Sequence, residues 1–215
     1  NDFNEVINDP DIDLVVELIG GTTFARTVVL GALAAGKNVV TANKALMATH
    51  GEEVMDAAAA AGKEIAFEAS VGGGIPIIDP LKHSLIANEI TSVMGIVNGT
   101  TNYMLTRMAD DGMDYAEALA EAQAAGFAEA DPSADVDGFD AAAKIAILAS
   151  IAFNSRVVMD QVHTDGITAI SPVDLEAARD MGYVVKLLAI AHRRPEGIDV
   201  RVHPTMIPDT HQLAT

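Results

Sequence analysis

The chain has 215 residues, a formal net charge of −18 at pH 7, and a composition that is half hydrophobic but only 4% aromatic. Nucleic acid and anionic membrane surfaces are disfavoured as partners, because both are themselves negatively charged. The absence of cysteine excludes disulfides and cysteine-based zinc sites. The longest apolar stretch, residues 141–153, contains Lys144 and is too short for a membrane helix. We therefore expect a soluble cytoplasmic protein with an aliphatic core.

The first third of the chain alternates short apolar runs with helical patterns. Strands are predicted at 14–19, 38–41 and 64–68, and single helices at 22–36 and 51–62 separate them. This alternation is typical of βαβ crossovers and a parallel sheet. Because the runs are apolar throughout, we expect both faces of the sheet to be covered. The chain begins without Met and inside a helical pattern, so we expect it to be part of a longer protein.

The regular alternation of single strands and helices ends after the glycines at 72–74. Further helices are predicted at 76–88, 100–111, 114–125 and 137–153, and further strands at 90–97, 184–191 and 198–207. We therefore predict an α/β protein in two parts. Residues 1–72 form the back half of a Rossmann-type parallel-sheet domain, and residues 73–215 form an α+β substrate domain.

Glycines follow the first predicted strand. Gly20 and Gly21 lie between that strand and a helix that Thr22 or Thr23 can cap. In open α/β sheets, ligands bind at the carboxyl ends of the strands, and glycine lets the backbone approach a ligand closely. This turn is a candidate nucleotide contact, and an ordinary strand-to-helix turn is the alternative.

Polar residues also follow the next two strands. Thr41 and Lys44 stand where the second strand ends, and Lys44 can contact a nicotinamide ribose or a reacting oxygen there. The alternative is an ordinary surface lysine with a buried stem. Glu68 precedes a glycine turn, and a carboxylate with exposed carbonyls can bind a hard cation. The alternative for this turn is a flexible hinge.

An acidic segment contains the strongest candidate for reaction chemistry. Five carboxylates between Glu129 and Asp140 lead into an apolar helix, in which Asp140 and Lys144 are one turn apart. Burying an unpaired ammonium is costly, so Lys144 is expected to be paired with acids or to face a polar cavity. Such a lysine suits proton transfer. An exposed ion pair conflicts with the apolar context, and a calcium loop conflicts with the ligand spacing.

These segments, in this order, resemble the homoserine dehydrogenase family over essentially the whole chain. The resemblance is carried by the blocks 16–21, 40–46, 67–76, 95–103 and 126–144. Membership implies NAD(P)-dependent interconversion of L-aspartate 4-semialdehyde and L-homoserine, a step toward threonine, methionine and isoleucine. It also implies a cytoplasmic homodimer, with the second domain contributing to dimerisation.

The resemblance also implies roles for individual residues. The proton-transfer residue is Lys144, helped by Lys44. The substrate contacts are Gly126, Glu129, Asp135 and Asp140. To these we add Thr100, because the polar helix start at 99–103 can bind a carboxylate through its backbone N–H groups; an ordinary helix cap is the alternative. The cofactor contacts are Ile19, Gly20, Gly21, Thr41 and Lys44. A sodium or potassium ion is expected at the Glu68 side chain and the carbonyls of Val71, Gly73 and Ile75.

Two departures from the family pattern affect these expectations. The glycine-rich phosphate loop of the first βαβ unit and the family's final stretch are absent, so we expect the chain alone to bind dinucleotide poorly. NAD and NADP both stay open, because the discriminating residue lies outside the chain. Another two-domain dehydrogenase, such as a sugar-type enzyme, is a rival that the acidic segment disfavours. A non-catalytic module with the same fold is another.

Overall fold

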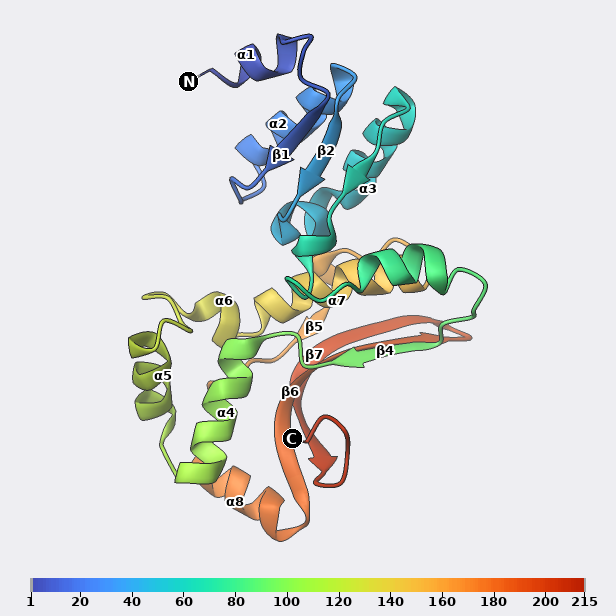
Figure 1. Cartoon of the computed structure of the whole chain (residues 1–215). Coiled ribbons are helices and arrows are strands. Elements are labelled where there is room, and N and C mark those ends of the chain that lie inside the picture. Colours follow the sequence, from blue (N-terminus) through green and yellow to red (C-terminus); the bar gives the residue numbers. More distant parts are fainter. Residues whose placement is uncertain (1, 215) are drawn as a thin grey trace. The chain divides into compact units, whose positions relative to one another are not determined.

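The structure is a computed structural model that describes residues 2–214, and its chain divides into two compact units (Figure 1). One unit comprises Asn1–Glu89 and Ala146–Asp160, and the other comprises Ile90–Ile145 and Gln161–Thr215. Helix α7 (Phe139–Ala152) contributes residues to both units. The domain boundary expected near residue 72 stays a prediction.

The first unit is built on a parallel sheet. In chain order its elements are α1 (Phe3–Asn8), β1 (Leu14–Glu17), α2 (Phe24–Ala34), β2 (Asn38–Thr41), α3 (Lys44–Ala61) and β3 (Ile65–Ala66). The strand order is β1-β2-β3, with Val15 opposite Val39 and Val39 opposite Ile65. The predicted parallel sheet with helical crossovers is confirmed (Figure 1).

The expectation that both faces of this sheet are covered is wrong for the described chain. Along β1, Val15 and Glu17 are buried, but Leu14 and Val16 on the opposite face are 49% and 56% exposed. Right-handed crossovers that proceed in one direction place successive helices on the same face of a sheet. Helices α2 and α3 pack against each other accordingly, and they leave the other face of β1 open.

Helix α3 begins earlier than predicted. Instead of starting at residue 51, it starts at Lys44, and the side chain of Asn43 caps it by accepting a hydrogen bond from the Leu46 N–H at 3.0 Å. The backbone at His50 is non-helical and marks a kink. A cap is also absent where one was expected, since the described Thr23 side chain makes no capping hydrogen bond to α2.

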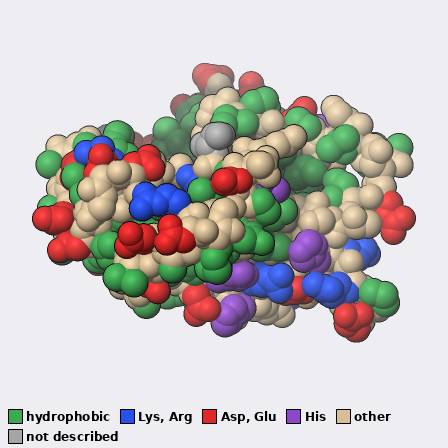
Figure 2. Space-filling model, turned by 90° about the horizontal axis from the view of Figure 1, so that it is seen from below, with side chains coloured by type: hydrophobic (Ala, Val, Ile, Leu, Met, Phe, Trp, Pro, Cys, Tyr) green, Lys and Arg blue, Asp and Glu red, His purple; other side chains and the backbone are tan. Residues whose placement is uncertain are grey.

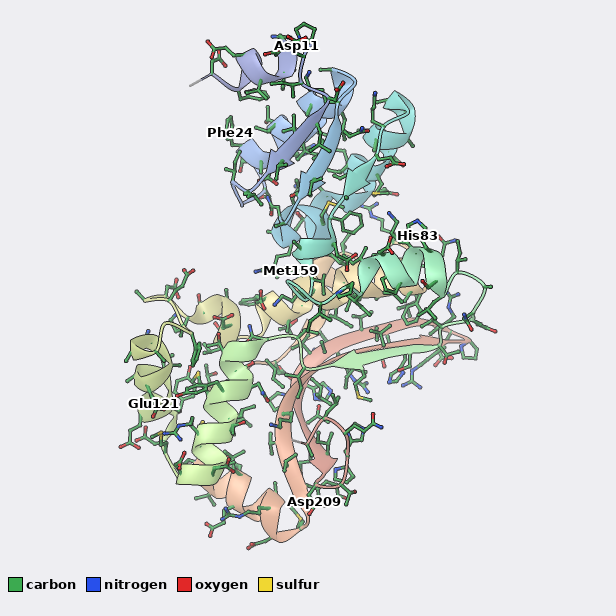
Figure 3. The ribbon with its side chains drawn as sticks, in the orientation of Figure 1. Asp11, Phe24, His83, Glu121, Met159 and Asp209 are labelled. Atoms are coloured by element: carbon green, nitrogen blue, oxygen red, sulfur yellow. The ribbon has the colours of Figure 1, made fainter. Side chains whose placement is uncertain are left out.

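The helix predicted at 76–88 is shorter than expected. The structure has a short helix, η1 (Glu68–Ser70), and then a π-helix, η2 (Pro80–Ser84), whose His83 Nδ1 lies 2.7 Å from Asp79 Oδ1 (Figure 3). The Glu68 carboxylate accepts hydrogen bonds from the N–H groups of residues 77, 78 and 79. A carboxylate thus satisfies the free N–H groups where the helical turns begin, beyond Pro76.

The second unit contains a four-stranded mixed sheet and its helices. In chain order the elements are β4 (Ser92–Gly95), α4 (Gly99–Asp111), α5 (Tyr115–Ala124), α6 (Ser133–Val136), β5 (His163–Thr164), α8 (Pro172–Asp180), β6 (Tyr183–Arg194) and β7 (Gly197–Pro208). The short helix η3 (Met159–Gln161) lies where the chain passes from the first unit to the second. The strand order is β4-β6-β7-β5, with only the β5–β7 pair parallel. The sequence pattern predicted β4, β6 and β7 but missed β5 and α8.

Polar contacts hold α4 in the second unit. Glu121 of α5, labelled in Figure 3, binds the Tyr103 hydroxyl and the Arg107 guanidinium of α4. On the sheet, the buried Lys186 donates to Asn102 Oδ1 at 3.1 Å, and burial lowers the pKa of this lysine. An apolar cluster of Leu188, Ile190 and Ile207 lies on β6 and β7.

The many acidic side chains on the surface agree with the net charge of −18. In the face shown by Figure 2, acidic side chains are scattered, several basic and histidine side chains lie near one another at the lower right, and further basic side chains lie on the left. No helix within residues 2–214 is both long and apolar enough to cross a membrane.

Candidate active site

Lys144 lies in a polar cluster in the second unit. Its Nζ donates to Asp140 Oδ2 and to the main-chain oxygen of Val97, both at 2.7 Å. The side chains of Lys144 and Asp140 are only 18% and 7% exposed. The sequence therefore correctly predicted that Lys144 would be paired with an acid. An ammonium has three N–H donors, and two of them are used within the described residues.

Asn98 connects this pair to a second carboxylate. Its Nδ2 donates to Asp140 Oδ2 at 2.9 Å and to Asp135 Oδ1 at 2.6 Å. Asp140 Oδ2 therefore accepts from both Asn98 and Lys144. The cluster brings together residues from the start of α4, from α6 and from α7. The sequence pattern indicated the two acids and the lysine but not Asn98, for which a polar side chain at a helix start was the only local indication.

The loop that contains Gly126 and Glu129 is attached to the start of α4. Thr100 is buried, and its hydroxyl donates to the Phe127 carbonyl at 2.7 Å. Gly126 has a φ of 77°, which reverses the chain after α5. Glu129 is exposed. The structure thus joins Thr100 to this loop through the backbone, and the Glu129 carboxylate is open to solvent.

Close backbone contacts hold the segment between Asp135 and Asp140. A Cβ added to Gly166 would lie 2.1 Å from the Val136 oxygen, and the N–H of Ile167 donates to that same oxygen at 2.8 Å. Gly138, at φ 86°, would place a Cβ 3.0 Å from Thr164. The acidic segment therefore packs directly on the β5–α8 connection, which the sequence did not predict.

A second polar cluster lies at the strand ends of the first unit. Glu17 is buried, and its carboxylate accepts from the N–H groups of Ile19 at 2.7 Å and Gly20 at 3.1 Å, and from the Thr41 hydroxyl at 2.6 Å. Burial by itself raises the pKa of Glu17, but these bonds, with Asn43 nearby, hold its pKa below the ordinary value. Glu17 was not among the site residues predicted from the sequence, although a charged residue within an apolar strand is a signal that could have indicated it.

The glycine turn after β1 is shaped by this network. Gly20 and Gly21 have φ values of 80° and 71°, and a Cβ on either would meet no atom within 4 Å. Asn43 Nδ2 donates to the Gly21 carbonyl at 2.8 Å, and Asn43 N–H donates to the Thr41 hydroxyl. The turn therefore borders open space in the described chain, as close approach of a nicotinamide cofactor requires. The exposed Lys44 follows as the first residue of α3.

The cation site is expected at the turn after Glu68. Gly72 and Gly73, at φ 77° and 59°, reverse the chain. Among the described residues, no donor binds the carbonyls of Val71, Gly73 or Ile75, so these oxygens are available as ligands of the kind a hard cation takes. The Glu68 carboxylate instead accepts from three backbone N–H groups, and its pKa is held below the ordinary value although burial opposes this. No group of three or more acidic or histidine side chains in residues 2–214 is arranged to hold a metal ion.

Comparison with known proteins decides the family. The family model described as homoserine dehydrogenase matches residues 76–215, and the model of the homoserine dehydrogenase NAD-binding domain matches residues 1–68. The chain belongs to the homoserine dehydrogenase family. The resemblance in the sequence blocks is thereby confirmed.

Individual homoserine dehydrogenases are similar along the whole chain. The protein from Corynebacterium glutamicum is 55% identical over 98% of this chain and 48% of its own length. The protein from Synechocystis is 52% identical over 100% of this chain and 50% of its own. The chain spans about half the length of the curated relatives it matches.

Solved structures agree with this assignment. The homoserine dehydrogenase from Thiobacillus denitrificans has a TM-score of 0.97 at 47% identity, covering 100% of this chain and 50% of that one. A hyperthermophilic archaeal homoserine dehydrogenase in complex with NADPH has a TM-score of 0.85 at 26% identity, covering 100% of this chain and 62% of that one. The α/β fold predicted from the sequence is confirmed.

Proposed function

We propose that the protein containing this chain interconverts L-homoserine and L-aspartate 4-semialdehyde with NAD or NADP. The observation that carries the proposal is the Lys144 ammonium, which Asp140 and the Val97 carbonyl hold in place. Family membership and the NADPH complex of the archaeal relative support the cofactor class.

Lys144 acts as the proton donor for the reducing direction. Two of its N–H groups bind Asp140 and Val97, so the third is available to the substrate oxygen. As the aldehyde oxygen gains negative charge, the ammonium stabilises it and transfers the proton. A bound nicotinamide supplies the hydride. In the oxidising direction, the neutral amine accepts the hydroxyl proton.

Carboxylates of the acidic segment bind the substrate's ammonium group. Glu129 is exposed beside Gly126, and Asp135 stands next to Asp140. Thr100 supports the same loop by holding the Phe127 carbonyl. This set of charges favours an amino-acid substrate over a neutral sugar, because a sugar has no cation to balance the carboxylates.

In the first unit, the turn after β1 contacts the cofactor. Ile19, Gly20 and Gly21 approach it through their backbone, while Thr41 shapes the turn from inside through its bond to Glu17. Lys44, at the start of α3, contacts the cofactor and assists Lys144. A sodium or potassium ion at Glu68, Val71, Gly73 and Ile75 steadies the following turn. We further propose that the protein is a cytoplasmic homodimer.

The test is Lys144→Ala in the complete gene product. We expect kcat for homoserine oxidation to fall about 10²- to 10⁴-fold, as loss of a proton-transfer group does, with cofactor affinity unchanged. Lys63→Ala, a change on a lysine outside both clusters, is the matched control. Near-normal turnover of the Lys144→Ala protein would contradict the assignment. Faster turnover of simple alcohols or sugars than of homoserine would favour the rival dehydrogenase, and no turnover of any of them would favour a non-catalytic module.

A further inference from the structure

Asn98 makes more polar contacts than a helix cap needs. It precedes α4, is only 5% exposed, and its Oδ1 accepts from the N–H and the hydroxyl of Thr101, each at 2.8 Å. These bonds cap the helix. The other end of the same amide binds Asp135 and Asp140. Both Nδ2 hydrogens and the amide oxygen are therefore used.

The two acids that share this amide come from different elements. Asp135 lies in α6 and Asp140 in the first turn of α7. Two carboxylates that bind one nitrogen must lie close together, and their charges repel each other in a site largely shielded from water. An amide group with two donors offsets this repulsion and fixes the spacing of the acids. Serine and aspartate also cap helices, but neither offers two such donors.

Val97, the residue before Asn98, connects the group of Asn98, Asp135 and Asp140 to Lys144. The Val97 carbonyl accepts from Lys144 Nζ, and Asp140 Oδ2 accepts from both Lys144 and Asn98. The position of the ammonium is thus defined by two adjacent residues of the β4–α4 connection and by an acid that one of them holds. A shift of the Asn98 amide would move Asp140 and, with it, the ammonium.

We propose that Asn98 is a positioning residue for this site, which sets the spacing of Asp135 and Asp140 and thereby the position of the Lys144 proton donor. The inference rests on the proposed function, since it concerns the turnover of the same reaction. It assigns to Asn98 a role beyond capping α4.

Variants of Asn98 can separate the two roles. Asn98→Ser in the complete gene product keeps an oxygen that caps α4 but removes both donors to the acids. We expect kcat for homoserine to fall about 10- to 100-fold, because small misplacements of reacting groups have effects of this size. The KM for the cofactor should stay within twofold. Asp114→Ser, which replaces the capping residue of α5 with another good cap, is the matched control and should leave kcat unchanged.

A negative charge introduced at position 98 provides the sharper test. Asn98→Asp keeps the cap and the size of the side chain but places a third carboxylate beside the two acids, so kcat should fall further than in Asn98→Ser. A helix cap alone predicts that Asn98→Asp keeps kcat near that of the wild type, because aspartate caps well.

The outcomes distinguish this inference from the proposed function. If the wild-type protein oxidises homoserine and Asn98→Ser does so within twofold of it, the inference is overturned and the proposed function stands. An equal loss in Asp114→Ser, or a kcat of Asn98→Asp within twofold of the wild type, also overturns it. If the wild-type protein does not turn over homoserine, the proposed function fails, and the role of Asn98 in turnover fails with it. Should Asn98→Ser not fold, Asn98→Asp decides the question.

Discussion

Replacing Gly166 with alanine tests how the acidic segment is held. The added Cβ would lie 2.1 Å from the Val136 oxygen and 2.5 Å from the Asp137 Cα, whereas ordinary contact begins at 3.4 Å. Both neighbours are backbone, so neither can rotate away. The same oxygen accepts the Ile167 N–H at 2.8 Å, and a backbone shift would weaken that bond. Either the β5–α8 connection or the segment between Asp135 and Asp140 must shift, and a shift of that segment would move the acids of the candidate site.

The size of the effect follows from two contributions. Overpacking costs about 1–3 kcal/mol and a lost hydrogen bond about 1 kcal/mol, so the free energy of unfolding should fall by roughly 2–4 kcal/mol. For a chain of 215 residues, that corresponds to a Tm lower by roughly 5–15 °C. Thermal unfolding followed by circular dichroism measures it, and kcat for homoserine should fall as well.

Gly95→Ala is the matched control for this measurement. Its added Cβ would meet only the Val97 side chain, at 3.8 Å, which is ordinary contact in the same unit. A Gly166→Ala protein whose Tm equals that of Gly95→Ala would show that the close approach of the β5–α8 connection to Val136 is wrong.

Two further predictions concern the first unit. The folded pKa of Glu17 lies below its ordinary value of 4.5, so its contribution to stability is present above that value and is lost as the pH falls through the lower folded pKa. Urea unfolding of Glu17→Gln should therefore show less stability than the wild type at pH 7 and a difference that shrinks below about pH 4.5, and a constant difference would contradict this. Sodium or potassium bound at the turn after Glu68 should raise the Tm with concentration more than tetramethylammonium chloride at equal ionic strength, and equal Tm values would remove the cation from the proposal.

Local patterns of the sequence determined much of the fold. Apolar strands separated by single helices predicted the parallel sheet of the first unit. The spacing of Asp140 and Lys144 on one helix predicted their pairing, because residues four apart on a helix share a face. The same patterns missed β5, which has only two residues, and α8, in which Leu175 and Ala178 are the buried positions.

The apolar character of β1 was not enough to predict whether both faces of the parallel sheet are covered. Apolar residues at Leu14 and Val16 predicted a covered face, but coverage depends on which elements pack there. The described helices α2 and α3 both lie on the other face of the sheet. An apolar strand therefore indicates that a face can be buried and leaves open what buries it.

The polar networks were decided by tertiary structure alone. Asn98 meets Asp135 and Asp140 across 37 and 42 residues of sequence, and Glu17 meets Thr41 across 24. The sequence by itself determined the family, the parallel sheet and the acid–lysine pair, because each follows from residues close together or from whole motifs. Only the packing of α4, α6 and α7 decided that one amide would stand between two acids, since a hydrogen bond requires atoms within about 3 Å and sequence spacing specifies such distances only within a turn or a strand pair.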